Sequence, residues 1–95
     1  MSIISNLNKA FDSRVRLGIM SILSVNASAD FNTMKELLDL TDGNLASHLK
    51  ALENIGYIQS QKQFIGRKPN TKYIMTELGQ DSFKEHLNAL ENLLK

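Results

Sequence analysis

Residues 40–53 read Leu40-Thr41-Asp42-Gly43-Asn44-Leu45-Ala46-Ser47-His48-Leu49-Lys50-Ala51-Leu52-Glu53, the pattern of a short amphipathic helix with two different faces. One face repeats Leu45, Leu49 and Leu52 at helical spacing and is predicted to be buried. The opposite face carries small, mostly polar side chains, at Asn44, Ser47, His48 and Ala51. Because Asn, Ser and His can donate and accept hydrogen bonds at base edges in a DNA major groove, this face predicts a recognition helix.

The sequence that follows predicts a β-hairpin with a basic tip. Residues 57–65 and 71–76 have the β-branched and aromatic content typical of strands. Between them, Gly66-Arg67-Lys68-Pro69-Asn70 predicts a turn. Gly56 predicts that the preceding helix ends in a left-handed conformation. Helix, strand, basic turn and strand are the order of a winged helix-turn-helix.

The chain before residue 31 is expected to form two helices. The spacing of Ile3, Leu7 and Phe11 allows a short helix over residues 2–11. The next helix, residues 13–25, can be capped by Asp12 or Ser13. It is apolar nearly all round, so we expect it at the centre of the fold.

A second pair of helices is expected to form the helix-turn-helix itself. Phe31 is predicted to be a very short strand, and Asn32 or Thr33 to cap the helix that follows it. The inward positions of this helix are Met34, Leu37 and Leu38. Thr41 is the predicted cap of the recognition helix. Two short helices joined by a tight turn are typical of this motif.

The last helix is predicted over residues 77–94, with Thr76 as its cap. Phe83, Leu87, Leu90 and Leu94 form an apolar stripe along it. The stripe can join the core of its own chain, but in so short a protein we expect it to meet a second copy. The interface predicted for a homodimer through the first and last helices comprises Leu7, Phe11, Phe83, Leu87, Leu90 and Leu94.

The length predicts one domain over residues 1–95, and the order of the predicted helices and strands places it in the α+β class, mostly α. Its 95 residues are 42% hydrophobic and 22% charged, which is ordinary for a globular protein. The predicted parts are an N-terminal segment with the first helix (1–25), the helix-turn-helix (31–55), a two-stranded wing (57–76) and a dimerisation helix (77–94). The sequence has no cysteine, which excludes a disulfide framework and a thiolate zinc site. No segment approaches the length of a membrane span or has the pattern of a signal peptide, so we expect a cytoplasmic protein without a membrane partner.

Positive charge is concentrated in the predicted wing. The net charge of the whole chain is only +1. No acidic residue occurs between Glu53 and Glu77, whereas this window contains Lys62, Arg67, Lys68 and Lys72. A cluster of this kind beside a candidate recognition helix favours double-stranded DNA as the partner.

Together these motifs resemble the winged-helix transcriptional regulators of the MarR/ArsR-like superfamily, especially their small, stand-alone dimeric members. The resemblance covers almost the whole chain, in family order. The matching segments are residues 13–20, 40–45, 48–53, 56–58, 66–69 and 71–79. It implies a homodimer on a pseudo-palindromic operator, with the third helix in the major groove and the wing arginine over the minor groove.

The candidate DNA-binding residues follow from these two elements. On the recognition helix they are Thr41, Gly43, Asn44, Ser47, His48 and Lys50, and on the wing they are Lys62, Arg67, Lys68 and Lys72. The polar helix face can also be plain solvated surface, but Arg at the tip of a β-ribbon is better explained by attraction to a minor groove. Three of the lysines serve equally well as phosphate contacts or as solubilising charges, namely Lys50, Lys62 and Lys72.

An enzyme is not expected. The two histidines, His48 and His86, lie far apart on different predicted helices, and the sequence has no glycine-rich phosphate loop, nucleophile elbow or zinc-protease motif. A metal site of His86 with Glu85 or Asp81 needs ligands from a partner chain. We therefore predict no catalytic residue, metal or cofactor, and the sequence identifies no effector.

Two function classes remain at this point. The first is a sequence-specific DNA-binding regulator, most simply a repressor that occludes a promoter. The second is a winged helix that binds another protein instead of DNA. Polar and basic side chains on the third helix and the wing favour the first, whereas an apolar patch there favours the second.

Overall fold

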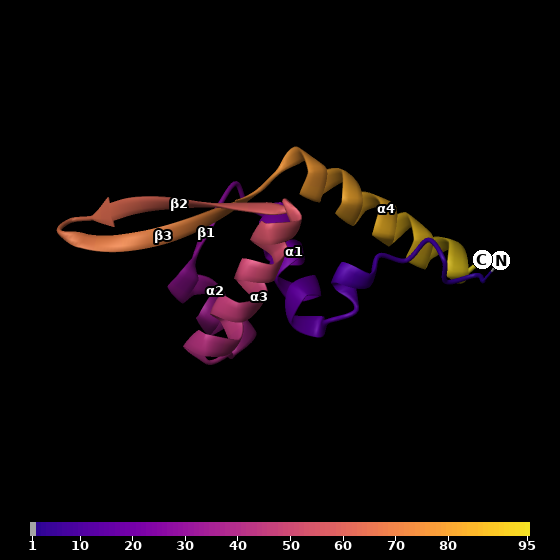
Figure 1. Cartoon of the computed structure of the whole chain (residues 1–95), viewed down its shortest axis with the longest axis horizontal. Helices are drawn as coiled ribbons and strands as arrows, with labels where there is room; N and C mark the ends of the chain where they lie inside the picture. Colours follow the sequence, from indigo (N-terminus) through magenta and orange to yellow (C-terminus); the bar gives the residue numbers. More distant parts are fainter. Residues whose placement is uncertain (1) are drawn as a thin grey trace.

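The computed structural model describes residues 2–95, in which three helices pack beneath a sheet and two long elements project in opposite directions (Figure 1). The elements are η1 (Lys9–Phe11), α1 (Arg14–Val25), β1 (Ala29–Asp30), α2 (Phe31–Leu38), α3 (Asp42–Ile55), β2 (Ile58–Ile65), β3 (Lys68–Met75) and α4 (Glu77–Leu93). The radius of gyration is 14.3 Å and the extents are 53 × 25 × 21 Å. A compact domain of this length has a radius of gyration of about 12 Å. The excess comes from the β2–β3 hairpin and α4.

Each α-helix begins after a short polar side chain that accepts a hydrogen bond from the backbone of its first turn. Ser13, Thr41 and Thr76 cap α1, α3 and α4, as predicted. The cap of α2 is instead Asp30, whose Oδ1 accepts the Thr33 N–H at 2.7 Å. The prediction of a strand at Phe31 is wrong by one residue: the strand is β1, and Phe31 is the first residue of α2.

The core lies where α1, α2 and α3 meet the base of the sheet. Its fully buried side chains are Ile19, Met20, Met34, Leu45, Leu49, Leu52 and Ile58. The leucine stripe of α3 and the central position of α1 are therefore confirmed. Leu37 was predicted to face inward, but this prediction is wrong because its side chain is 66% exposed. The short α2 uses Met34 and Leu38 as its inner stripe, and Leu38 packs on Gly18 of α1.

The sheet has the strand order β1-β3-β2, all antiparallel, so a third short strand joins the predicted two-stranded wing. The turn contains only Gly66 and Arg67, because Ile65 already pairs with Lys68. The predicted five-residue turn is thus too long, and its last three residues belong to β3. Gly66 has a φ of 64°, which suits the first central position of a two-residue hairpin turn. Pro69 is tolerated because β1 pairs only with Lys72 and Tyr73, which leaves the edge of β3 beside Pro69 open.

The N-terminal segment does not form the predicted helix over residues 2–11. It forms turns, followed by the single 3-10 turn η1. Asn8 is extended because its backbone N–H donates to His86 Nδ1 at 3.0 Å and its side chain donates to the Tyr57 hydroxyl at 2.9 Å. These contacts with α4 and the start of the sheet prevent a helix from continuing through Asn8.

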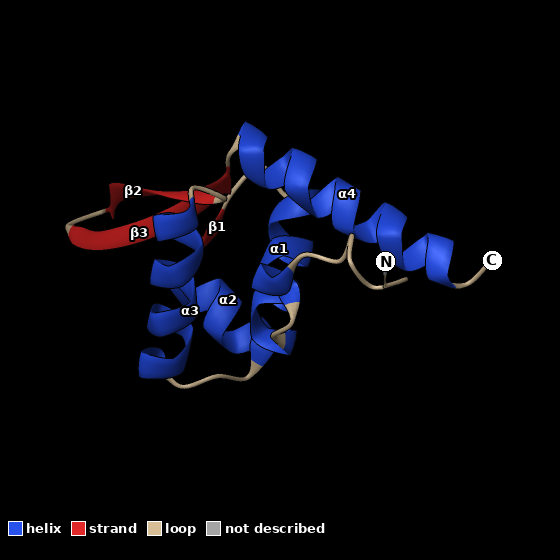
Figure 2. Ribbon diagram, turned by 45° about the vertical axis from the view of Figure 1, so that its right-hand side comes forward, coloured by secondary structure: helices blue, strands red, loops and turns tan. Residues whose placement is uncertain are grey.

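The last helix confirms the predicted boundaries to within one residue. Its first turn lies against the backbone of Tyr57, and Phe83 packs edge-on against Phe11 with ring centroids 5.5 Å apart. Beyond these contacts α4 leaves the helical core, as Figure 2 shows, and it ends beside the N-terminal segment. None of the helices formed by residues 2–95 is both long and apolar enough to cross a membrane.

Candidate nucleic-acid interface

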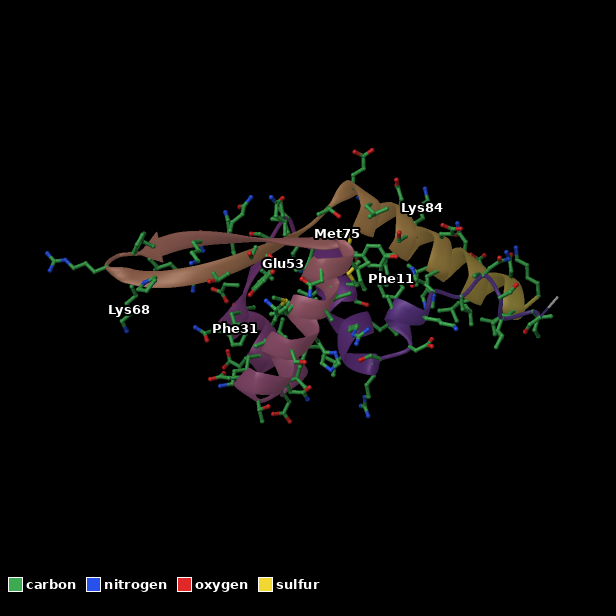
Figure 3. The ribbon with its side chains drawn as sticks, viewed as in Figure 1. Phe11, Phe31, Glu53, Lys68, Met75 and Lys84 are labelled. Atoms are coloured by element: carbon green, nitrogen blue, oxygen red, sulfur yellow. The ribbon has the colours of Figure 1, made fainter. Side chains whose placement is uncertain are left out.

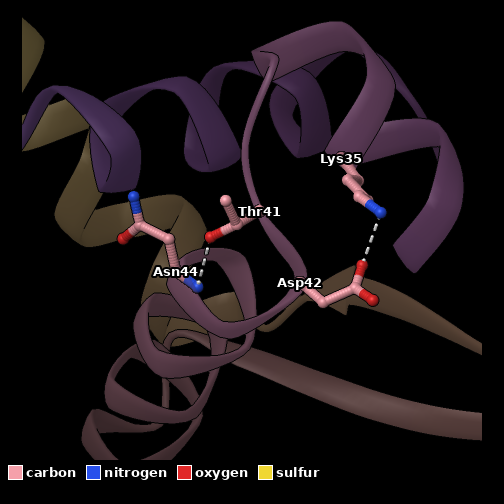
Figure 4. A network of polar contacts seen from close by, with 4 residues as sticks. All are labelled: Lys35, Thr41, Asp42 and Asn44. Atoms are coloured by element: carbon pink, nitrogen blue, oxygen red, sulfur yellow. Dashed lines mark hydrogen bonds and ion pairs between the residues drawn. The ribbon is translucent and has the colours of Figure 1, made fainter.

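The outward face of α3 presents most of the side chains that the sequence proposed for base reading. Gly43, Asn44, Ser47 and Lys50 are exposed, opposite the buried leucines. Thr41 is also exposed, but its hydroxyl caps the helix by accepting the Asn44 N–H at 3.2 Å. The side-chain amide of Asn44 points away from Asp42 (Figure 4) and makes no hydrogen bond within residues 2–95. Asn44 and Ser47 are therefore open to a ligand.

The start of α3 is tied to α2 by an ion pair. Lys35 Nζ lies 2.7 Å from Asp42 Oδ1 (Figure 4), and the two side chains are 41% and 74% exposed. An exposed pair of this kind adds little to stability. Its effect on the site is electrostatic, because Lys35 offsets a carboxylate that would repel a phosphate at the N-terminus of α3.

His48 departs from the predicted open face. Its side chain is half-buried, and its Nδ1 accepts a hydrogen bond from Arg16 Nε of α1 at 3.2 Å. Burial, and secondarily the charge of Arg16, lowers the pKa of His48. Sequence reasoning did not assign Arg16 to the site. The available signal was a pair of arginines, Arg14 and Arg16, in the first turn of α1.

The C-terminal end of α3 is joined to strand β2 of the wing by the side chain of Glu53. Glu53 Oε2 accepts hydrogen bonds from the Ser60 hydroxyl at 2.6 Å and the Ser60 N–H at 3.2 Å. Ser60 pairs with Tyr73 across the sheet. Burial, then the charge of Glu53, raises the pKa of Tyr73. Because Glu53 binds β2, the wing projects from a defined point beside the recognition helix.

The wing does not bring all four of its basic residues together. Lys62, Arg67 and Lys68 are exposed along the projecting part of the ribbon, and Figure 3 shows Lys68 near the tip. Lys72 is half-buried at the base, where it pairs with Asp30 across the sheet and lines a groove of about 370 Å³ with it. The tip also carries two exposed apolar side chains that the sequence analysis did not single out, Phe64 and Ile65.

The residues predicted for a dimer interface separate into two groups. Phe11 and Phe83 are buried within the chain itself, so their burial requires no partner. Leu7 and Leu90 are half-buried, whereas Leu87 and Leu94 are 45% and 88% exposed. Ile3 and Ile4 add further exposed apolar surface at the end of the molecule where both termini lie (Figure 1).

The fold and this surface define a winged helix. Residues 15–94 match the winged helix DNA-binding domain family, and the chain belongs to this family. Both the fold and the type of small winged-helix regulator expected from the sequence are confirmed.

Similar proteins cover almost the same length. The chain is 38% identical over 87 residues to the uncharacterized protein MJ0432 of Methanocaldococcus jannaschii. The aligned region covers 92% of this chain and 95% of that protein. A solved structure of a transcriptional regulator homologue protein from Pyrococcus horikoshii OT3 is 34% identical in sequence and matches with a TM-score of 0.85. The match covers 97% of this chain and 89% of that one. The structure of reduced AbfR bound to DNA shares the fold at 19% identity, with a TM-score of 0.79 and coverage of 98% of this chain and 64% of that one.

Proposed function

We propose that this protein is a sequence-specific DNA-binding transcriptional regulator. The observation that carries the proposal is the exposed polar face of α3 beside a projecting basic wing, with the side chains of Asn44 and Ser47 making no hydrogen bond within residues 2–95. A helix face that contacts only solvent typically carries Glu and Lys, whereas this face carries the small polar side chains of Asn44 and Ser47. The family, and a fold neighbour whose structure is described as bound to DNA, support the same function.

In this proposal α3 enters the major groove with its N-terminal half. Asn44 can pair with adenine through two hydrogen bonds, and Ser47 tolerates several bases. Gly43 leaves open space at the start of the helix, where the partial positive charge of the helix terminus favours a phosphate. Arg67 at the wing tip reaches the adjacent minor groove, which has a negative potential.

The proposed regulator acts as a homodimer on an imperfect palindrome. Leu87 of α4, Leu94 just after it and the isoleucines of the N-terminal segment lie toward the end of the molecule opposite the wing tip. A two-fold contact there places two recognition helices on one side of the duplex, with half-sites roughly one helical turn, ~34–36 Å, apart. Occupying such a site over a promoter gives the simplest regulatory outcome, repression.

Selection of binding sites from random duplexes tests this function. Wild-type protein should enrich a motif with dyad symmetry. Asn44→Ala and Ser47→Ala should each reduce the base preference at one or two positions of the motif by about 1–3 kcal/mol, while folding stays intact. Lys84→Ala on α4 is the control and should leave the motif unchanged. Enrichment of no motif would contradict DNA reading and favour protein binding, and a motif without symmetry would contradict the dimer.

A further inference from the structure

The first turn of α1 lies beside the recognition face and carries two arginines. Arg14 and Val15 line an open groove of about 610 Å³ together with Asn44 of α3 and residues 37–40. One turn of α3 further on, Arg16 Nε donates to His48 Nδ1 at 3.2 Å. Two cationic side chains of α1 therefore border the same stretch of α3 that is proposed to read bases.

The hydrogen bond from Arg16 determines which nitrogen of His48 can donate. A neutral imidazole has one N–H and one acceptor nitrogen. Because Nδ1 accepts from Arg16, the proton of neutral His48 is on Nε2. Within residues 2–95 no side-chain nitrogen or oxygen is both buried and without a hydrogen-bond partner. His48 Nε2 has no partner among these residues, so it is not sealed from solvent.

Arg16 keeps donors of its own. Its Nε is used by His48, which leaves the two terminal nitrogens of the planar guanidinium. Across residues 2–95 no carboxylate lies within ion-pair distance of Arg16. A guanidinium with no acidic partner, at the border of a surface proposed for DNA, has the geometry and the charge to bind a phosphate.

We propose that Arg16 and His48 act as one DNA-reading unit: Arg16 binds a backbone phosphate and holds His48 as an Nε2–H donor toward a base edge. The inference rests on the proposed function. In the major groove a donor matches guanine, adenine N7 and thymine O4, whereas cytosine offers only its own amino donor. The unit therefore excludes cytosine at the position that His48 faces, and it gives α1 a part in a recognition surface otherwise made by α3 and the wing.

Binding measurements separate this role from a structural one. The selected wild-type duplex and a scrambled duplex are titrated with wild type, Arg16→Ala, Arg16→Lys and Lys84→Ala over a range of salt concentrations. Arg16→Ala should weaken binding to both duplexes about tenfold. The slope of log binding constant against log salt concentration should fall by about one in magnitude. Arg16→Lys retains the charge and should keep the slope. Lys84→Ala, which removes a charge from the distant face of α4 (Figure 3), should behave as wild type.

Base preference and tautomer give two further readouts. His48→Ala and Arg16→Ala should both admit cytosine at the same motif position. Long-range nitrogen–proton NMR correlations should show a single Nε2–H tautomer for His48 in the wild type and a tautomer mixture in Arg16→Ala. The proposal fails if wild type selects a motif but Arg16→Ala matches Lys84→Ala in slope and motif, or if free His48 already populates both tautomers. Absence of any selected motif would instead count against the proposed function.

Discussion

The His86 imidazole Nδ1 accepts the backbone N–H of Asn8 at 3.0 Å, a contact between residues 78 positions apart. The His86 ring is 5% exposed and packs edge-on against Phe11 with ring centroids 5.1 Å apart. Its polar atom and its apolar surface thus both hold the N-terminal segment against α4. These are the two elements proposed to form the dimer surface, so His86 organises that surface from within one chain.

Removing His86 should release the N-terminal segment. His86→Ala deletes the acceptor of the Asn8 N–H and the packing on Phe11, and we expect a loss of about 2–3 kcal/mol in the free energy of unfolding. Denaturant titration measures the loss, and amide exchange at Asn8 should accelerate. Glu85→Ala, at an exposed neighbouring position, is the control. Equal midpoints for the two variants would show that the contact contributes nothing.

Two glycines should respond in opposite ways to the same substitution. A Cβ at Gly79 would collide with the carbonyl oxygen of Tyr57, whereas a Cβ at Gly43 meets nothing within 4 Å. Gly79→Ala should therefore destabilise the fold by at least about 1–3 kcal/mol through overpacking. Gly43→Ala should stabilise it by about 0.5–1 kcal/mol, because alanine is the better helix former. Thermal unfolding compares the two.

Gly43→Ala also separates stability from DNA binding. If the start of α3 lies close to a phosphate, the added methyl group should weaken binding to the selected duplex although the fold is more stable. Fluorescence anisotropy with the selected duplex measures this loss. Unchanged affinity would show that the backbone at Gly43 does not approach the DNA closely.

Leu87 of α4 and Leu94, which follows it, should control the oligomeric state, because both are exposed apolar side chains. Burial of one leucine contributes roughly 1.5–3 kcal/mol, so Leu87→Asp combined with Leu94→Asp should give monomers. Light scattering of the purified protein measures this. Leu37→Asp is a matched control, because Leu37 is also exposed, at 66%, but lies on α2. A double variant that remains fully dimeric would exclude this surface as the interface.

The two ends of the wing should contribute unequally to DNA affinity. Arg67→Ala at the tip should weaken binding to all duplexes and lower the salt slope by about one unit. Lys72→Ala should change neither, because Lys72 is half-buried at the base beside Asp30. Titrations over a range of salt concentrations compare them. A larger effect for Lys72 than for Arg67 would show that DNA contacts the base of the wing.

Stability should fall on the acid side of neutrality partly because of His48. Burial and Arg16 lower the pKa of His48 in the folded state, while its value in the unfolded chain is about 6.5. The unfolded chain therefore binds the proton first, and stability is lost as the pH falls below about 6.5 toward the folded-state pKa. Unfolding midpoints of wild type and His48→Gln over this range measure it. The variant should lose less stability than wild type, and parallel curves would rule out a contribution from His48.

Local patterns in the sequence were enough for α1, α3 and α4 and for their ends, but not for the cap of α2 or for residues 2–11. The leucine stripe of α3, the caps Ser13, Thr41 and Thr76, and the left-handed Gly56 all depend on residues within one or two helical turns of each other. The stretch between Glu53 and Glu77, which has no acidic residue, likewise predicted where the basic hairpin lies. Such features are predictable because their energy comes from neighbours along the chain.

Tertiary structure alone decided the features that join distant segments. Asn8 is bound to Tyr57 and His86, so residues 2–11 did not become a helix despite their apolar spacing. Arg16 meets His48 from 32 positions away, which changed an open histidine into a half-buried acceptor. Strand register placed Lys72 beside Asp30, a partner that lies 42 positions earlier in the sequence. The spacing of apolar, polar and charged residues reports which face of an element is buried, but the partner of a single polar side chain depends on how whole elements pack, and no local window of sequence contains that information.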